Sequence, residues 1–254
     1  MNKNLAHLIT HWTPSNILSK EGNANKFCLI VLNQPIHHIN TFSHLWKNAS
    51  FRFVADGGSN RLYDAFKHDP QILEQHLPDE IRGDLDSIRP DVHAYYESKQ
   101  VKITRVSDQD STDFMKCVAL LHEKEKTQGQ IYDIVATPAF GGRFDQTMHN
   151  VNLLYTLNDQ SERRTILVSD ENLTMLLDKG THHIHCQPTL EGPICGIMPI
   201  GYPATLTTKG LRWNLTDTKC QMGGMFSTSN QIEDKLIEVI TDAPVVWTIE
   251  IHHK

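Results

Sequence analysis

Between residues 27 and 168, short apolar runs alternate with segments of helical periodicity, and this alternation constrains the fold more than any other feature. The apolar runs are FCLIVLN, FRFVADGG, IRGDLDSI, VKITRV, YDIVATPAF and RRTILVSD. In one of the intervening segments, Phe114, Cys117, Val118 and Leu121 recur at the spacing of a single helix face. Strands that alternate with helices predict an α/β domain whose mostly parallel sheet is covered on both faces.

The sequence pattern changes after about residue 170. Short β-like pieces, punctuated by glycine and proline, replace the helical segments: THHIHC, GPICGIMPI, ATLTT, LRWNL, MFSTSN, KLIEVIT and VVWTIEI. They predict an all-β sandwich or barrel-like domain. The first residues are polar and predict a loose extension. We therefore expect an extension over 1–25, an α/β domain over 26–168 and a β domain over 169–254.

Charge and composition exclude several function classes. A formal net charge of −6 and a pI near 6.2 disfavour a main activity on nucleic acids or acidic membranes. The five cysteines are odd in number and none are spaced as CxxC, which favours a reduced, cytoplasmic compartment. No run approaches the roughly 20 apolar residues of a membrane span.

IRGDLDSI places two aspartates, Asp84 and Asp86, where a parallel sheet binds ligands, beyond the carboxyl end of a strand. In an extended chain, residues i and i+2 share a face, so both carboxylates can reach one cation. Magnesium suits this arrangement because it combines one or two carboxylates with water and substrate phosphates. The alternative is a solvated turn with an Asx cap, helped by Gly83.

A second acidic cluster, Asp108, Asp110 and Asp113 in VSDQDSTDF, precedes the next helical segment. Asp110 as N-cap, with Asp113 as a capping-box partner, would account for one or two of these carboxylates. Capping does not require all three, and Gln109 and Thr112 add hydrogen-bonding groups. Two acidic clusters at neighbouring strand ends favour a shared divalent ion.

GGRFDQ, residues 141–146, combines two glycines with a guanidinium. Gly141 and Gly142 allow backbone N–H groups to approach an anion, and Arg143 offers a planar fork for phosphate oxygens. Asp145 would cap the next helix or join the metal shell. The alternative is a glycine-rich turn with a surface arginine. No Walker A motif occurs in the chain, which excludes a P-loop kinase.

Two further features admit mainly structural interpretations. THHIHC places His183 and His185 on one strand face, yet their spacing does not match zinc-finger patterns, so a half-exposed strand is favoured over a zinc site. Trp213 in GLRWNL either stacks on a flat ligand ring or belongs to the core.

Six segments in this order resemble the eukaryotic thiamine pyrophosphokinases: ADGGSNRLYD, GDLDSIRP, SDQDSTDFMKC, GGRFDQTMHNVN, TKGLRWNL and FSTSN. The resemblance spans nearly the whole chain after residue 25. It implies an α/β catalytic domain followed by a β-sandwich, a homodimer, and Mg²⁺-dependent transfer of pyrophosphate from ATP to thiamine, which releases AMP.

The resemblance also implies roles for individual residues. Asp84, Asp86 and Asp113 would bind the metal and, with Arg143 and Asp145, form the catalytic set. The implied nucleotide-side residues are Asp56, Asn60, Arg61, Gln109, Thr112, Gly141 and Gly142. Thiamine would lie at the dimer interface, close to Trp213, Ser227, Ser229 and Asn230.

One segment departs from the family pattern. The family approaches GGR through a glycine-rich run, whereas this chain has TPAFGGR, and Pro138 has no N–H to offer a phosphate. Two other functions stay open on the sequence. One is a metal-dependent phosphohydrolase acting on nucleotide diphosphates, and the other is a non-catalytic thiamine diphosphate sensor.

Overall fold

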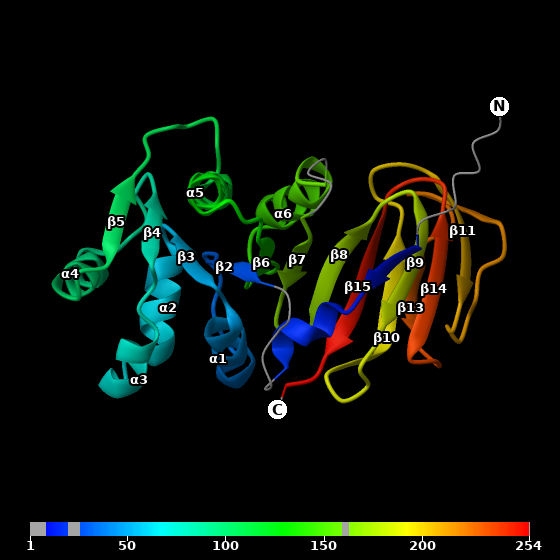
Figure 1. The fold of residues 1–254 in the computed structure, drawn as a ribbon, viewed down its shortest axis with the longest axis horizontal. Helices are drawn as coiled ribbons and strands as arrows, with labels where there is room; N and C mark the ends of the chain where they lie inside the picture. Colours follow the sequence, from blue (N-terminus) through cyan, green and yellow to red (C-terminus); the bar gives the residue numbers. More distant parts are fainter. Residues whose placement is uncertain (1–8, 20–25, 159–162, 254) are drawn as a thin grey trace. The chain divides into compact units, whose positions relative to one another are not determined.

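The computed structural model describes residues 9–19, 26–158 and 163–253, which fall into two compact units (Figure 1). The α/β unit comprises residues 20–170, and the β unit combines residues 1–19 with residues 171–253. The chain passes from one unit to the other after Asp170, two residues beyond the position at which the sequence placed the change.

The α/β unit is built on a parallel sheet. In the described part of this unit the strands run in the order β7-β6-β2-β3-β4-β5, and every neighbouring pair is parallel. All six predicted strands are present, as β2 (Phe27–Val31), β3 (Phe51–Ala55), β4 (Glu80–Gly83), β5 (Lys102–Arg105), β6 (Asp133–Thr137) and β7 (Thr165–Val168). The central strand β2 is buried along its whole length, as expected for a sheet covered on both faces.

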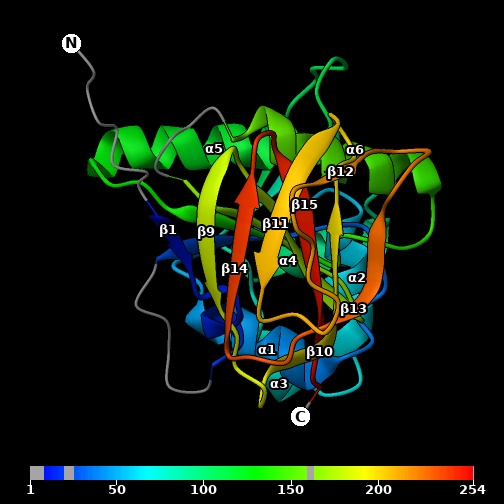
Figure 2. The ribbon, with the colours of Figure 1, turned by 90° about the vertical axis from the view of Figure 1, so that its right-hand side faces the viewer.

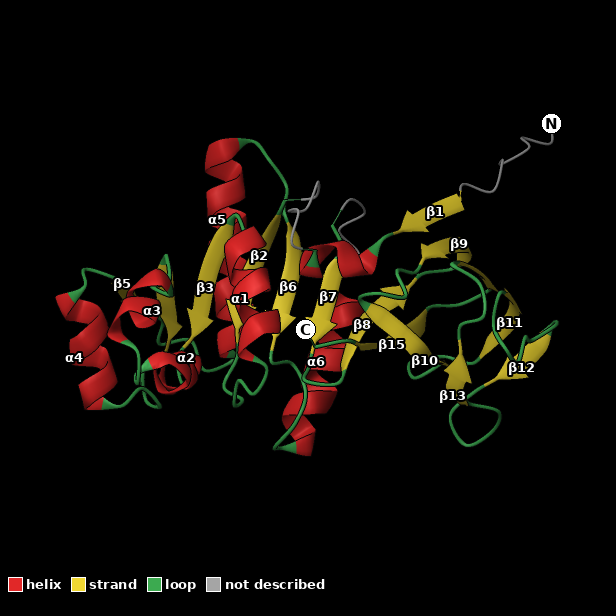
Figure 3. Ribbon diagram, turned by 90° about the horizontal axis from the view of Figure 1, so that it is seen from below, coloured by secondary structure: helices red, strands yellow, loops and turns green. Residues whose placement is uncertain are grey.

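Helices cover both faces of this sheet, with α1, α2 and α3 on one side and α5 and α6 on the other (Figures 1 and 3). Right-handed crossovers explain why the helices divide between the two faces. The chain adds strands in one direction from β2 to β5 and then returns to add β6 and β7 on the other side of β2, so the later helices cover the opposite face. The helices are α1 (Ile39–Asn48), α2 (Gly58–Phe66), α3 (Pro70–Gln75), α4 (Pro90–Ser98), α5 (Asp113–Gln128) and α6 (Phe144–Thr156). Within the described residues, none of the helices has the length and apolar character needed to cross a membrane.

The start of α5 differs from the prediction. Thr112, not Asp110, is the N-cap, and its side chain accepts the Met115 N–H at 3.4 Å. Asp110 lies in the preceding turn, where its own N–H donates to the Asp108 carboxylate at 2.9 Å. The helix ends where expected, at Gly129, whose φ of +66° is the left-handed conformation that glycine adopts without strain.

The β unit consists of two sheets, as the predicted sandwich requires (Figure 2). One has the order β1-β9-β14-β11-β12, and the other contains the antiparallel run β13-β10-β15-β8. The strands are β1 (Ile9–Trp12), β8 (Asn172–Leu177), β9 (Gly180–His185), β10 (Glu191–Met198), β11 (Ala204–Lys209), β12 (Thr218–Cys220), β13 (Ser227–Gln231), β14 (Leu236–Thr241) and β15 (Val245–Ile251).

LRWNL, which the sequence predicted as β-like, is not a strand. Only Leu211 pairs, in an isolated bridge with Ile232. The Asn214 side chain closes the segment into a loop, since its Oδ1 accepts the Leu211 N–H at 3.1 Å and its Nδ2 donates to the Leu211 carbonyl at 2.8 Å. This local bonding competes with a sheet ladder.

The loose extension predicted for residues 1–25 contains regular structure. Ile9–Trp12 forms β1, which pairs in parallel with β9, and a 3₁₀ helix, η1, covers Pro14–Leu18. Trp12, Ile17 and Leu18 are buried in the β unit. The sequence missed this because a four-residue edge strand is too short to show periodicity. Residues 1–8 and 20–25 lie outside the described residues.

Glu191 ties this N-terminal segment to β10 and makes the stability of the β unit dependent on pH. Its buried Oε1 accepts the Ser15 hydroxyl and the Gln187 N–H, both at 2.9 Å. Burial raises the pKa of the Glu191 carboxyl to about 7. The two hydrogen bonds and the nearby His252 act in the opposite direction, but burial has the larger effect. The folded state therefore holds this proton more tightly than the unfolded chain does.

We expect the free energy of unfolding to fall by up to about 3 kcal/mol as pH rises from about 4.5 to about 7, and to level off above that. Glu191→Gln should flatten this dependence. Urea unfolding followed by tryptophan fluorescence suits the measurement, because three of the four tryptophans, Trp12, Trp213 and Trp247, belong to the β unit. The exposed Glu233→Gln is the matched control. Equal slopes in parent and Glu191→Gln would contradict the assignment.

Candidate active site

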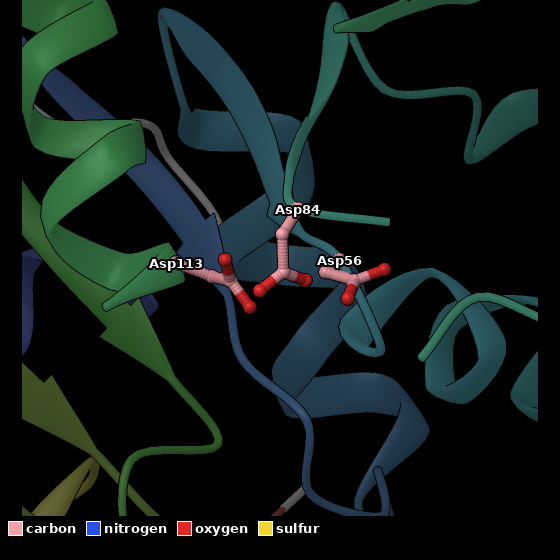
Figure 4. A group of neighbouring side chains, drawn as sticks. All are labelled: Asp56, Asp84 and Asp113. Atoms are coloured by element: carbon pink, nitrogen blue, oxygen red, sulfur yellow. The ribbon is translucent and has the colours of Figure 1, made fainter. Parts of the chain in front are cut away.

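Three aspartates from separate segments meet in the α/β unit (Figure 4). Asp56 directly follows β3, Asp84 directly follows β4, and Asp113 is the first residue of α5. One carboxylate oxygen of each lies within 4.8 Å of those of the other two. The carboxyl ends of neighbouring parallel strands meet at one edge of a sheet, which brings together residues far apart in sequence. Each of the two acidic clusters singled out in the sequence therefore contributes one aspartate to this group, Asp84 from the first and Asp113 from the second.

Asp56 is the most constrained member of this group. It is fully buried, its φ is +25°, and its two carboxylate oxygens accept the N–H groups of Ser87 and Ile88, each at 3.1 Å. Burial raises its pKa to about 6, and the nearby charges of Asp113 and Asp84 add to the effect of burial. Three carboxylates so close together repel one another, and a bound cation would relieve that repulsion.

Asp86 does not belong to the three-carboxylate group, contrary to the expected pairing of Asp84 with Asp86. That pairing required an extended chain, but β4 ends at Gly83 and Leu85 has a φ of +63°. The chain turns, the Asp86 N–H donates to Asp84 Oδ1 at 3.3 Å, and the Asp86 carboxylate accepts the Ser87 hydroxyl at 2.8 Å. Asp56, which the resemblance placed on the nucleotide side, takes the third position in the group.

Gly83 allows the carboxylates to approach. A Cβ at this position would lie 2.5 Å from the Cβ of Asp56 and 3.0 Å from Oδ1 of Asp113. Both distances are shorter than a normal contact, so only glycine leaves Asp56 and Asp113 where they are.

One face of the segment running into α2 holds the loop that carries Asp84. Asp56, Asn60 and Asp64 follow one another at intervals of four residues. Asn60 donates to the Ser87 carbonyl at 2.8 Å and accepts the Arg89 N–H at 3.0 Å, while Asp64 binds the Arg89 guanidinium through two bonds of 2.7 and 2.9 Å. Asn60, expected near the nucleotide, thus has both polar atoms committed to this loop. Arg61 is bonded to Asn33 Oδ1 at 2.9 Å.

A buried lysine accompanies the carboxylates, and the sequence reasoning gave it no role. Lys116 is 4% exposed, and its Nζ lies 3.0 Å from Asp113 Oδ1 and 3.9 Å from Asp84 Oδ2. The available signal was its position, three residues after Asp113 on the same helix. Burial favours a higher pKa for Asp84, but the Asp86 N–H and the Lys116 charge outweigh burial, so that pKa is lowered.

Asp84 and Asp113 border a cleft of ≈ 360 Å³ within the α/β unit. Its walls come from the ends of β2, β3, β4 and β6 and from the first turns of α5 and α6. The strand order reverses between β2 and β6, and this switch point is where open parallel sheets bind ligands. Its polar lining includes Asn33, Gln34, Asp84, Gln109, Thr112, Asp113, Lys116, Arg143, Gln146, His149 and Asn150.

Thr112 and Gln109, both expected near the nucleotide, line this cleft. The Thr112 hydroxyl lies 2.9 Å from Nε2 of His149, a residue that the sequence analysis did not select. Burial lowers the pKa of His149, which favours a neutral imidazole at physiological pH.

The glycine loop before α6 has the backbone freedom predicted for it. Gly141 and Gly142 have φ values of +118° and +60°. Arg143 lines the cleft, is largely exposed and pairs with Asp145, its Nε donating to Oδ1 at 3.0 Å. Asp145 is therefore a partner of Arg143 and not a member of the three-carboxylate group.

The departure from the glycine-rich pattern removes two backbone donors from this loop. Pro138 has no N–H, and the Ala139 N–H donates to the Val168 carbonyl at 2.8 Å. Any contact between the backbone N–H groups of this loop and a phosphate must therefore come from residues after Ala139.

In the β unit, three of the four residues expected around thiamine are directly connected. The buried Asn230 accepts the Trp213 N–H at 3.2 Å and donates to the Trp213 carbonyl at 2.9 Å and to the Ser227 hydroxyl at 3.3 Å. The Trp213 side chain itself is 54% exposed, with the Arg212 guanidinium 5.0 Å from its ring centre. Ser229 is exposed and has a φ of +56°. Trp213 is thus a surface aromatic ring and not a core residue.

Comparison with known proteins assigns the family. Residues 42–168 match the model of the thiamin pyrophosphokinase catalytic domain, and residues 181–246 match that of the thiamin pyrophosphokinase vitamin B1 binding domain. Thiamine pyrophosphokinase 2 of Arabidopsis thaliana is 42% identical over 241 residues, covering 91% of this chain and 88% of the relative. The chain belongs to the thiamin pyrophosphokinase family.

Solved structures of the thiamin pyrophosphokinase family agree. The yeast thiamin pyrophosphokinase structure has a TM-score of 0.87 at 27% identity and covers 99% of this chain and 94% of its own. The structure from Candida albicans has a TM-score of 0.83 at 30% identity, with coverage of 96% and 93%. The catalytic-domain match ends with β7, and the vitamin B1 binding match lies inside the β unit. The family resemblance read from the sequence is confirmed.

Proposed function

We propose that this chain transfers the pyrophosphoryl group of ATP to the primary hydroxyl of thiamine, which gives thiamine diphosphate and AMP. The observation that carries the proposal is the meeting of Asp56, Asp84 and Asp113 at the switch-point cleft of a chain from this family. In the proposed reaction the hydroxyl oxygen bonds to the β-phosphorus, the bond from that phosphorus to the AMP oxygen breaks, and the hydroxyl proton is released.

The donor set fits Mg²⁺. Three carboxylates converge, all ligand atoms are hard oxygens, and the buried Asp56 has a raised pKa that a cation would lower again. Asp84, Asp113 and Asp56 would hold the ion, with Asp86 adjacent. When bound, Mg²⁺ supplies charge neutralisation on the phosphate oxygens.

The chain's own residues position the nucleotide in this proposal. Arg143 and the N–H groups of Gly141 and Gly142 would contact the polyphosphate, and Gln109 and Thr112 would contact the substrates from the opposite wall of the cleft. Pyrophosphoryl transfer depends mainly on positioning and charge stabilisation, and this set of groups provides both.

Thiamine is proposed to stack on Trp213, with Ser227, Ser229 and Asn230 around it, at the interface of a homodimer. Support comes from the exposed indole and from the bonds that Asn230 makes to Trp213 and Ser227. Sedimentation velocity of the pure protein tests the dimer, and a monomer at assay concentrations would contradict it. A cytoplasmic location belongs to the same proposal, supported by five cysteines that are all buried and free.

The deciding assay incubates the protein with ATP, MgCl₂ and thiamine and quantifies AMP and thiamine diphosphate. We expect equal amounts of the two products, no AMP when thiamine is omitted, and no product in excess EDTA. AMP formed without thiamine would indicate the phosphohydrolase, and thiamine diphosphate binding without turnover would indicate the sensor.

Trp213→Ala should raise the KM for thiamine at least about fivefold, because stacking on an aromatic ring contributes about 1 kcal/mol or more. The KM for ATP should change less than about twofold, because in this proposal ATP does not contact Trp213. Steady-state kinetics with each substrate varied in turn measures both constants. Tyr202→Ala removes another exposed aromatic ring of the β unit and is the control. An equal rise in both KM values would remove Trp213 from the thiamine site.

A further inference from the structure

Two side-chain amides, those of Asn33 and Gln34, line the cleft just after β2, where the strand order reverses. Strand β2 lies between β3 and β6 in the sheet, and each amide lies against the loop that follows one of these neighbours. A Cβ on Gly57, after β3, would be 2.3 Å from Asn33 Nδ2, and a Cβ on Gly142, after β6, would be 2.8 Å from Gln34 Nε2. Both glycine-containing loops of the site therefore have an amide beside them.

The two amides differ in their hydrogen bonds. Asn33 Oδ1 accepts the Nε–H of Arg61 at 2.9 Å, so this amide already belongs to a bonded pair. The backbone N–H of Gln34 donates to the Leu32 carbonyl at 2.9 Å, whereas its side-chain amide has no hydrogen-bond partner among the residues that the structure describes. The half-buried Gln34 thus brings N–H donors and a carbonyl acceptor to the cleft that are available to a ligand.

Packing against the glycine loop fixes where the Gln34 amide lies. Its Nε2 and Oε1 are both 2.8 Å from the position that a Cβ on Gly142 would take, and its Oε1 is 3.6 Å from that of a Cβ on Gly141. The amide therefore fills space that another residue type in the loop would occupy with its own side chain. A side chain held in this way loses little rotamer freedom when it binds a ligand.

The glycine loop lacks donors that Gln34 can replace. Pro138 has no N–H, and the Ala139 N–H is bonded to the Val168 carbonyl, so neither is available to a phosphate. Phosphate oxygens are bound by N–H groups and guanidinium groups that point at them together. The chain therefore has a side-chain donor at the same loop in which two backbone donors are missing.

We propose that Gln34 donates its Nε2–H to the pyrophosphoryl part of ATP at the glycine loop, alongside Arg143. This contact rests on the proposed function, to which it adds a residue that binds the nucleotide. The pyrophosphoryl part carries most of the negative charge of ATP, and a hydrogen bond to a charged group is stronger than one between neutral groups. It is also the part that is transferred, so a donor placed there helps to position the reacting group.

The test measures binding of α,β-methylene-ATP, whose bridging carbon prevents the transfer, to the full-length protein in MgCl₂ without thiamine. Isothermal titration calorimetry should show at least about tenfold lower affinity in Gln34→Met, which keeps the length of the side chain and removes the hydrogen bond. Gln34→Glu should lose more, because it puts a negative charge beside the phosphates. Gln71→Met, at an exposed position of α3, is the matched control and should bind as the parent does.

AMP locates the contact because it lacks the pyrophosphoryl part. Its affinity for Gln34→Met should stay within about twofold of the parent value, which also shows that the variant is folded. Equal affinities of α,β-methylene-ATP for parent and Gln34→Met would overturn the proposal. A loss of AMP affinity as large as that of the analogue would do the same, since it would place Gln34 at the nucleoside or the α-phosphate.

Thiamine diphosphate formation by the parent is measured separately and tests the proposed function. A parent that forms this product, with a Gln34→Met variant that binds the analogue normally, would remove Gln34 alone. A parent that forms none, yet binds the analogue more tightly than Gln34→Met does, would contradict the transfer reaction and keep the Gln34 contact. A parent that does not bind the analogue would contradict both.

Discussion

Asp84→Asn should lower kcat by about 10³-fold or more at saturating ATP and thiamine, because charge stabilisation by a bound metal contributes several kcal/mol to such a reaction. Asp84 and Asp113 are the two members of the three-carboxylate group that line the cleft, whereas Asp56 is fully buried. Mg²⁺ affinity should fall in the same variant. Its stability without Mg²⁺ should not exceed that of the parent, since the Asp86 N–H and the Lys116 charge lower the pKa of Asp84 and its ionised form therefore favours the folded state.

Asp86→Asn is the informative comparison for that variant. The sequence treated Asp84 and Asp86 as equivalent, whereas the structure puts only Asp84 within reach of Asp56 and Asp113. We expect the loss of kcat in Asp86→Asn to be at least about tenfold smaller, because an adjacent charge contributes less than a direct ligand. Asp91→Asn, on the exposed side of α4, controls for the loss of a negative charge. Full activity of Asp84→Asn in Mg²⁺ would remove the metal role.

Lys116→Met should destabilise the metal-free protein by about 3 kcal/mol, because the variant leaves partly buried carboxylates without their internal countercharge. Lys116 is almost fully buried, while Asp113 and Asp84 keep part of their exposure to solvent. We further expect Mg²⁺ to raise the unfolding midpoint more in the variant than in the parent, since the ion then supplies the only compensating positive charge at this position.

Urea unfolding with and without MgCl₂ measures both effects. Lys126→Met, on the exposed surface of the same helix, is the matched control and should change neither quantity by more than about 0.5 kcal/mol. Equal stabilisation of parent and Lys116→Met by Mg²⁺ would show that Lys116 fills space and does not balance charge. A loss of kcat that persists at saturating Mg²⁺ would indicate that Lys116 also positions Asp113.

The contrast between Asp84 and Asp86 illustrates where sequence reasoning lost precision. The i, i+2 rule holds only while a strand continues, and Leu85 leaves the extended region directly after Gly83. The same limit applies to LRWNL, where the Asn214 side chain replaces a sheet ladder, and to α5, where Thr112 caps the helix in place of Asp110. In each case a local hydrogen bond overrode the propensity of the segment.

Periodicity and motif order determined the larger features. The alternation of apolar runs and helical stripes in residues 27–168 predicted each strand of the parallel sheet, because a strand buried on both faces needs a continuous apolar run. The change of pattern near residue 170 predicted the sandwich. Both are short-range properties of the chain, so they can be read without coordinates.

Only the tertiary structure decided which polar groups meet. Asp56, Asp84 and Asp113 come together through the pairing of β3 with β4 and the packing of α5 on both strands, and Lys116 becomes a partner of Asp113 and Asp84 only once α5 is in place. Gln34 lies against Gly142 only because β2 pairs with β6. Such contacts depend on burial and register between distant segments, and neither quantity is encoded within a short stretch of residues.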